Sequence, residues 1–130
     1  MLLYVQAGVC GQVGKPEQGL ALLDEAMEIA SHWTGRAMLP EFLRVKGDLL
    51  LAVAPDNAPE AEGWLQQALE VARELDARML ELRVAISLSR LWRAQGRAER
   101  SRQVLSEVYK TFTEGFATND LIEAKELLGI

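Results

Sequence analysis

The sequence contains one cysteine, Cys10, and one histidine, His32. A disulfide within the chain needs two cysteines, and the common zinc sites need several Cys or His ligands together. No stretch approaches the roughly 18 consecutive apolar residues of a membrane-spanning helix. These absences exclude an internal disulfide and a Cys/His zinc site. They predict a cytoplasmic protein with no membrane partner.

Basic charge is also scarce, because 14 Lys and Arg residues face 19 Asp and Glu residues and give a net charge of −5. Nucleic-acid-binding proteins usually carry a basic surface that contacts phosphate. The sequence lacks a Gly-x-x-x-x-Gly-Lys-Ser/Thr loop for phosphates, and no pair of carboxylates stands out as an acid and base. We therefore predict a protein that is not an enzyme and has no nucleic-acid partner, cofactor, metal or catalytic residue.

Proline occurs only 4 times in 130 residues, and β-branched residues are sparse beside Ala, Leu, Glu, Arg and Gln. This composition favours helices over strands. Apolar residues recur at three- and four-residue spacing between Gly- and Pro-containing breaks. The pattern predicts an all-α chain with helices near residues 1–13, 16–32, 40–53, 59–75, 78–95, 98–112 and 119–128.

Small residues recur where paired helices of a tetratricopeptide repeat cross, because larger side chains would hold the backbones apart. Ala26 in the first unit, Gly47 and Ala61 in the second, and Ser89 and Ser101 in the third occupy such places. We predict a tetratricopeptide-like α-solenoid of about three antiparallel helix pairs in a single domain, residues 1–130. The repeats would span about 1–33, 39–76 and 78–113, followed by a capping helix at about 119–128. The alternative is a generic antiparallel helical bundle in which the small residues align by chance.

The two ends of the predicted stack differ. Met1 to Val5 are mostly apolar, as expected of a helix that packs on a preceding repeat, so we predict self-association through this N-terminal helix. Asp120 and Glu123 have capping-box spacing at the start of the last helix.

Two stretches, Glu81 to Arg97 and Val108 to Phe116, resemble the C-terminal tetratricopeptide-repeat region of large bacterial signal-transduction ATPases. Leu43 to Leu51 and Ala68 to Arg73 resemble the same region. Proteins of this kind are labelled predicted ATPase, adenylate or guanylate cyclase, or LuxR-like and winged-helix transcriptional regulators. The resemblance implies a regulatory tail that senses a ligand or partner. It carries no ATPase or cyclase activity onto this chain, which lacks those motifs.

In this repeat class, the first helix of each pair lines a concave groove. Mapped onto this sequence, the exposed groove positions are Glu41, Arg44, Asp48, Arg83, Ile86, Arg90 and Arg93. Five of them, Arg44, Asp48, Arg83, Arg90 and Arg93, form the predicted partner-binding site. The three arginines of the third unit would share a face and bind an acidic peptide or carboxylate. Alternatively, they pair with Asp48, Glu81 or other nearby acids and solvate the helix.

The leading hypothesis for function is a non-catalytic protein–protein interaction or regulatory module, the sensor or scaffold part of a bacterial signalling or transcriptional regulator. Its partner would be a protein or peptide. The rival hypothesis is a small-molecule-sensing helical domain or a small helical enzyme with a pocket in the concave groove. Trp64 and Trp92 fall on the apolar stripes of their helices, which predicts packing and not a ligand cage.

Overall fold

The computed structural model describes residues 16–112 and 118–129 of the chain. The regular structure of these residues is entirely helical, as predicted. The predicted helix at 1–13 and the self-association through Met1 to Val5 lie outside the described residues. The helices are α2 (Pro16–Thr34), α3 (Leu39–Val53), α4 (Ala58–Glu74), α5 (Arg78–Ala94), α6 (Ala98–Tyr109) and α7 (Asn119–Leu128), with a 3₁₀ turn, η1 (Pro55–Asn57), between α3 and α4.

The helix boundaries follow the proline and glycine positions. Pro40 and Pro59 lie in the first turns of α3 and α4, where the missing N–H has no helical partner to lose. Gly96 follows α5 with a φ of +78°, a left-handed conformation that glycine adopts without steric cost. The Arg97 N–H then donates to the Trp92 carbonyl at 2.7 Å and closes the turn into α6.

The capping-box prediction for α7 is wrong. Thr118 is the N-cap residue and forms no side-chain cap hydrogen bond, and Asp120 lies two residues after it, inside the first turn of the helix. Asp120 and Glu123 instead form ion pairs with arginines of α5.

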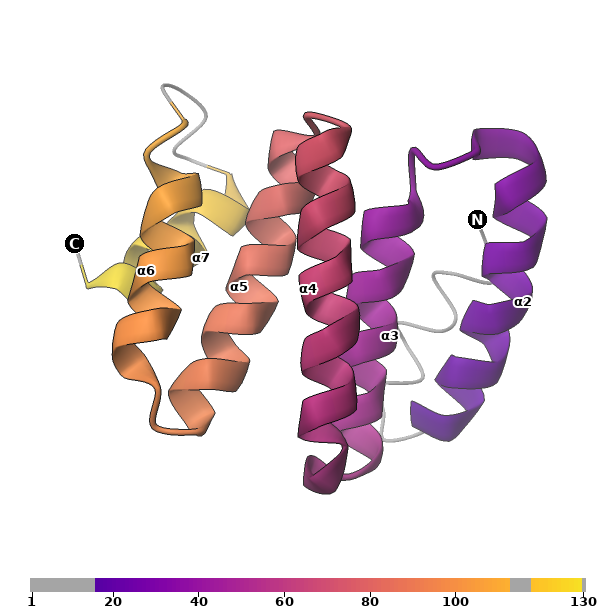
Figure 1. Cartoon of the computed structure of the whole chain (residues 1–130), viewed down its shortest axis with the longest axis horizontal. Coiled ribbons are helices and arrows are strands. Elements are labelled where there is room, and N and C mark those ends of the chain that lie inside the picture. The colour runs from indigo at the N-terminus through magenta and orange to yellow at the C-terminus, as the bar shows by residue number, and fades with distance from the viewer. Residues whose placement is uncertain (1–15, 113–117, 130) are drawn as a thin grey trace.

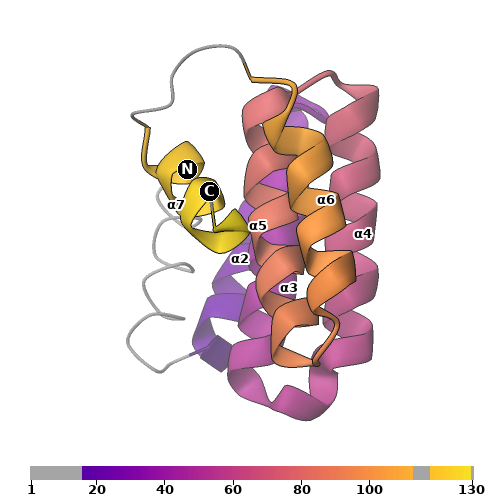
Figure 2. The ribbon, with the colours of Figure 1, turned by 90° about the vertical axis from the view of Figure 1, so that its left-hand side faces the viewer.

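Consecutive helices pack against each other and are joined at alternating ends of the molecule (Figure 1). Two further contacts skip one helix and join α3 to α5 and α5 to α7. In the perpendicular view, α4 and α6 lie on one side of α5, and α7 lies on the other (Figure 2). None of the described helices combines the length and apolar character that crossing a bilayer requires.

Helix α5 lies at the centre of the larger apolar core, as the apolar residues on most of its sides predict. Trp92 is 4% exposed and packs in this core, and Trp64 packs against its edge. A second apolar cluster joins Leu23, Ala26 and Ala30 of α2 to the opposite side of α3. Helix α3 is therefore covered by α2 on one side and by α4 and α5 on another.

Helices α3 and α4 cross so closely at Gly47 that a methyl group does not fit. A Cβ atom on Gly47 would lie 2.9 Å from Leu65 Cγ and 3.2 Å from the Ala61 carbonyl oxygen. The corresponding contact between α5 and α6 joins Ser89 and Ser101, whose hydroxyl oxygens are 2.6 Å apart in a buried hydrogen bond. Both contacts involve residues that the sequence predicts at helix crossings.

A pair of glycine substitutions tests the close crossing. Gly47→Ala should lower the free energy of unfolding by about 1–2 kcal/mol, because overpacking outweighs the gain in helix propensity. Gly63→Ala, in α4, is the matched control: its Cβ would meet nothing within 4 Å, so the variant should gain about 0.5–1 kcal/mol. Urea unfolding followed by circular dichroism measures both values. Equal stabilisation by the two changes would contradict the crossing.

Candidate functional site

Helix α3 places Glu41, Arg44 and Asp48 on one face, because they are three and four residues apart. The Arg44 guanidinium donates to both acids: Nε to Glu41 Oε1 at 2.9 Å and Nη1 to Asp48 Oδ2 at 3.0 Å. A second, short contact joins Arg44 Nη2 to the same Glu41 oxygen. Arg44 thus holds two carboxylates on the surface of α3 that faces α5.

Arg83 of α5 extends this arrangement to α7. Its Nη1 lies 3.4 Å from Glu41 Oε2, and its Nε donates to Asp120 Oδ2 at 3.0 Å. The hydrogen bond with Asp120 raises the pKa of Arg83 above its ordinary value, opposed by partial burial and assisted by the charge of Glu41. Arg83 therefore connects α3, α5 and α7 through one side chain.

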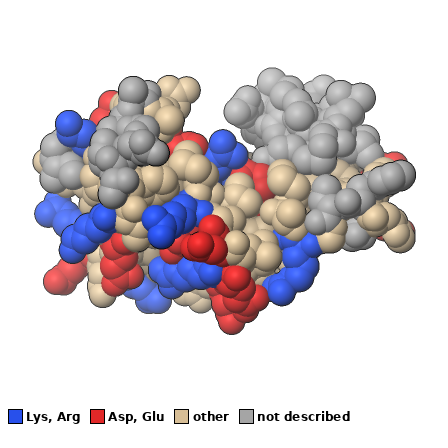
Figure 3. All heavy atoms as spheres, turned by 90° about the horizontal axis from the view of Figure 1, so that it is seen from above, with Lys and Arg blue, Asp and Glu red and all other residues tan. Residues whose placement is uncertain are grey.

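Arg90, two turns along α5, forms an ion pair with Glu123 of α7. Arg93 is exposed in the last turn of α5 and forms no ion pair with residues 16–112 or 118–129. In the view from above, basic and acidic side chains alternate along the described surface (Figure 3). Arg83 and Arg90 therefore pair with nearby acids, as the alternative interpretation of the arginines predicts.

Two of the mapped groove positions are buried, and Arg44 and Asp48 are half-buried. Glu41 is 1% exposed because Arg44 and Arg83 both close over its carboxylate. Ile86 is 3% exposed because α5 is surrounded by α3, α4, α6 and α7. Both predictions of exposure were wrong. Of the two acids proposed as partners for these arginines, Glu81 pairs with Arg73 of α4 at 2.9 Å and Asp48 pairs with Arg44 at 3.0 Å.

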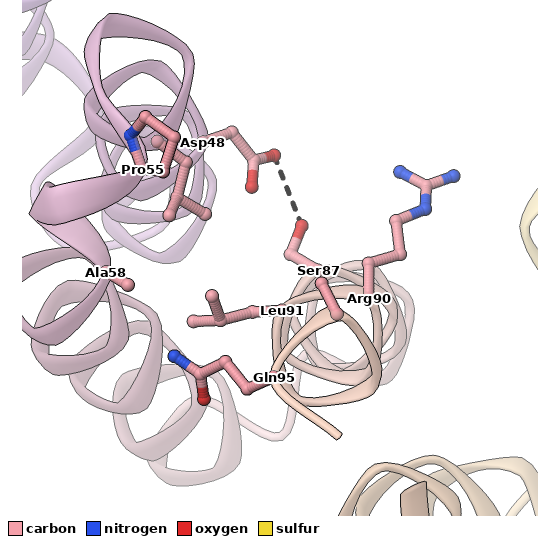
Figure 4. Close-up of a pocket in the computed structure, with 9 residues that line it drawn as sticks. Asp48, Pro55, Ala58, Ser87, Arg90, Leu91 and Gln95 are labelled. Atoms are coloured by element: carbon pink, nitrogen blue, oxygen red, sulfur yellow. Dashed lines mark hydrogen bonds between the residues drawn. The ribbon is translucent and has the colours of Figure 1, made fainter. Parts of the chain in front are cut away.

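A pocket of about 430 Å³ opens beside the acid–base network, between the C-terminal halves of α3 and α5 and the start of α4. The loop between α3 and α4 shapes it, since η1 brings Pro55 to its edge and the Asn57 side chain donates to the Leu50 carbonyl at 2.9 Å. Its lining includes Asp48, Leu51, Pro55, Ala58, Ser87 and Leu91 (Figure 4). Asp48 and Arg90 are the predicted site residues that also line the pocket.

Asp48 connects the network to the pocket. Its Oδ2 accepts the Ser87 hydroxyl at 3.2 Å as well as Arg44, and its side chain keeps 40% of its accessible surface. Desolvation raises the pKa of Asp48, although the charges of Arg44 and Arg90 and the Ser87 hydrogen bond oppose the shift. Asp48 is thus surrounded by protein on most sides and reaches solvent through the pocket.

Comparisons of the chain with models of protein families, with curated proteins and with solved structures find no match. The resemblance to the repeat region of bacterial signalling ATPases thus stays a prediction from the sequence. The chemistry of the site follows from its own geometry. Among the described residues, no three His, Cys, Asp or Glu side chains are placed together as a metal ion requires.

Sequence analysis missed Ser87 and the apolar lining of the pocket. Ser87 lies within the apolar stretch from Val84 to Leu88 of α5 and is 4% exposed. A hydroxyl among apolar residues of one helix was the available sign of a polar partner. The cluster from Pro55 to Pro59 was predicted as a break between helices but not as part of a pocket.

Asp48→Asn tests the electrostatics of the pocket through pH. Because the pKa of Asp48 is higher in the folded than in the unfolded chain, the folded protein binds this proton more readily. The wild type should therefore lose stability relative to the variant as pH rises from about 4 through the raised folded value. Urea unfolding at several pH values between about 4 and 7 measures this difference. Glu70→Gln, on the exposed face of α4, removes the same charge and is the control. A wild type that gains stability relative to Asp48→Asn as pH rises would contradict the assignment.

Proposed function

We propose that the chain is a non-catalytic interaction module whose α3/α5 face receives a segment of another protein. The observation that carries the proposal is the open pocket of about 430 Å³ on this face, with apolar walls and a few polar groups at its edge. Such a composition provides buried apolar area for affinity and fixed polar groups for orientation.

The repeated helix pairs support a tetratricopeptide-like arrangement. In the α3/α4 pair Gly47 lies against Ala61, and in the α5/α6 pair Ser89 lies against Ser101. The first helices of the two pairs, α3 and α5, also contact each other. Stacked pairs of this kind create an extended surface along the first helices, which is where repeat proteins bind their partners.

From the resemblance of the sequence, we propose that this module is the sensor or scaffold part of a bacterial signalling or transcriptional regulator in the cytoplasm. An acid–base network around a buried carboxylate suits that role because it fixes the relative positions of α3, α5 and α7 without needing a partner. Glu41 is buried between Arg44 and Arg83, and Arg93 remains exposed at the end of α5.

The second candidate is a small-molecule sensor or a small helical enzyme that uses the same pocket. The pocket volume favours this candidate, since sites for small molecules commonly occupy about 300–1,000 Å³. In that case a compound, and not a protein segment, fills the space beside Asp48.

Selection from a peptide-display library tests the leading proposal. Enriched peptides should bind the wild type and lose affinity by about tenfold or more with Ala94→Trp, because this substitution fills the edge of the pocket. Gln66→Trp adds the same side chain to an exposed position of α4 outside the pocket and should leave binding unchanged. Isothermal titration calorimetry measures the affinities, and circular dichroism checks the fold of each variant. Equal binding to both variants, or no enrichment, would contradict a peptide-binding face here.

A further inference from the structure

The Asp48 carboxylate in the pocket has hydrogen-bond acceptor positions that no described residue uses. Both hydrogen bonds to Asp48, from Arg44 at 3.0 Å and from Ser87 at 3.2 Å, end on Oδ2. No hydrogen bond from a described residue reaches Oδ1, although an ionised carboxylate offers about four acceptor positions on its two oxygens. The side chain is 40% accessible, and Figure 4 shows the oxygen that is not bonded to Ser87 directed toward the side of the pocket where Leu91 lies, so Oδ1 is placed to meet a ligand.

The arginine at the edge of the pocket does not neutralise this carboxylate directly. The Arg90 guanidinium pairs with Glu123 of α7, and Figure 4 shows it turned away from Ala58, Leu91 and Gln95. Arg90 therefore lines the pocket without directing its charge into the space between those residues.

Arg44 is shared as well. Two of its nitrogen atoms contact Glu41, and a third donates to Asp48. One guanidinium charge thus serves two carboxylates on α3. Desolvation still raises the pKa of Asp48 in this setting, which indicates that its charge is only partly compensated.

The remaining surface of the pocket is largely hydrocarbon. Leu51 and Pro55 form one side, Ala58 lies at the start of α4, and Leu91 and Ala94 lie along α5. A ligand that complements both the Asp48 carboxylate and these apolar walls carries a positive charge at one end and an alkyl chain behind it.

We infer that this pocket binds an alkylammonium group, whose nitrogen donates to Asp48 Oδ1 and whose hydrocarbon chain packs against Leu51, Ala58 and Leu91. An ammonium has three N–H donors, and the Ser87 hydroxyl oxygen, which lies beside the Asp48 carboxylate, provides a second acceptor. A ligand with a carboxylate would be repelled by the negative charge of Asp48 in this partly desolvated site. A neutral alkyl chain would leave that charge uncompensated.

The inference rests on the proposed binding role of the α3/α5 face and specifies its chemistry. The same group has two sources: a lysine side chain of a protein partner, or a free alkylamine. Both offer an ammonium on an unbranched chain of four or more carbons.

Nuclear magnetic resonance titrations of the ¹⁵N-labelled chain with hexylammonium, hexanol and hexanoate test the inference. Hexylammonium should shift the amide signals of Ala58, Ser87 and Leu91, and hexanol and hexanoate should bind at least about tenfold more weakly, because they lack the charged hydrogen bond. This comparison uses the wild type alone and does not depend on the folding of a variant.

Asp48→Asn should reduce hexylammonium binding to the level of hexanol, whereas Glu70→Gln should leave it unchanged although both lower the negative charge by one. Equal hexylammonium binding by wild type and Asp48→Asn would overturn the inference. So would hexanoate binding as tightly as hexylammonium, because it would show that Arg90 turns inward and recognises an anion.

A pentapeptide of alanine with one central lysine, and the same peptide with norleucine in its place, distinguish the two sources. Binding by the lysine peptide alone supports a partner's lysine, and binding by hexylammonium without the peptide supports a free amine. Failure of both cations, with display-selected peptides still sensitive to Ala94→Trp, would overturn the alkylammonium inference and leave the proposed interaction role intact.

Discussion

The close crossing of α3 and α4 at Gly47 sets the position of the helix on which the site is built. A Cβ atom at this residue would lie 2.9 Å from Leu65 Cγ, so the two helices are closer than a side chain at position 47 allows without a shift. Helix α3 is held between this contact and the α2 cluster around Leu23 on its other side. Its remaining face, which carries Glu41 and Asp48, is thereby directed toward α5. A larger residue at 47 would displace α3 and change the geometry of that face.

The polar groups on this face form a series of ion pairs that runs from α3 through α5 to α7. Glu41 is buried because two arginines, Arg44 and Arg83, cover it, and a buried carboxylate without such partners would be strongly unfavourable. Arg83 in turn holds Asp120, which fixes α7 against α5. Asp48, at the other end of the network, receives less compensation and meets the pocket. The network therefore combines the buried Glu41, whose arginine partners fix the helices, with Asp48, whose carboxylate remains accessible to a ligand.

The helices and their crossing points could be predicted from the sequence because they depend on local patterns. Apolar spacing located every described helix, and the small residues Gly47 and Ser89 indicated where helices meet. The exposure of Glu41 and Ile86 could not be predicted in the same way, because it depends on how α3 and α5 pack together and on the other helices around α5. The acids of α7 had two possible roles in the sequence, a helix cap or partners for arginines, and only the position of α7 beside α5 distinguishes them. The pocket likewise forms where α3, α4 and α5 converge, which no single segment determines.

A crystal structure of the chain grown with hexylammonium tests most directly the claim that the α3/α5 face is a binding site with Asp48 as its charged group. The account predicts an alkyl chain between Leu51 and Leu91, with its nitrogen within hydrogen-bond distance, about 3 Å, of Asp48 Oδ1. It also predicts that α7 keeps its ion pairs with α5, since the ligand uses a carboxylate outside them. An empty pocket, or a ligand bound with its nitrogen away from Asp48, would contradict the account.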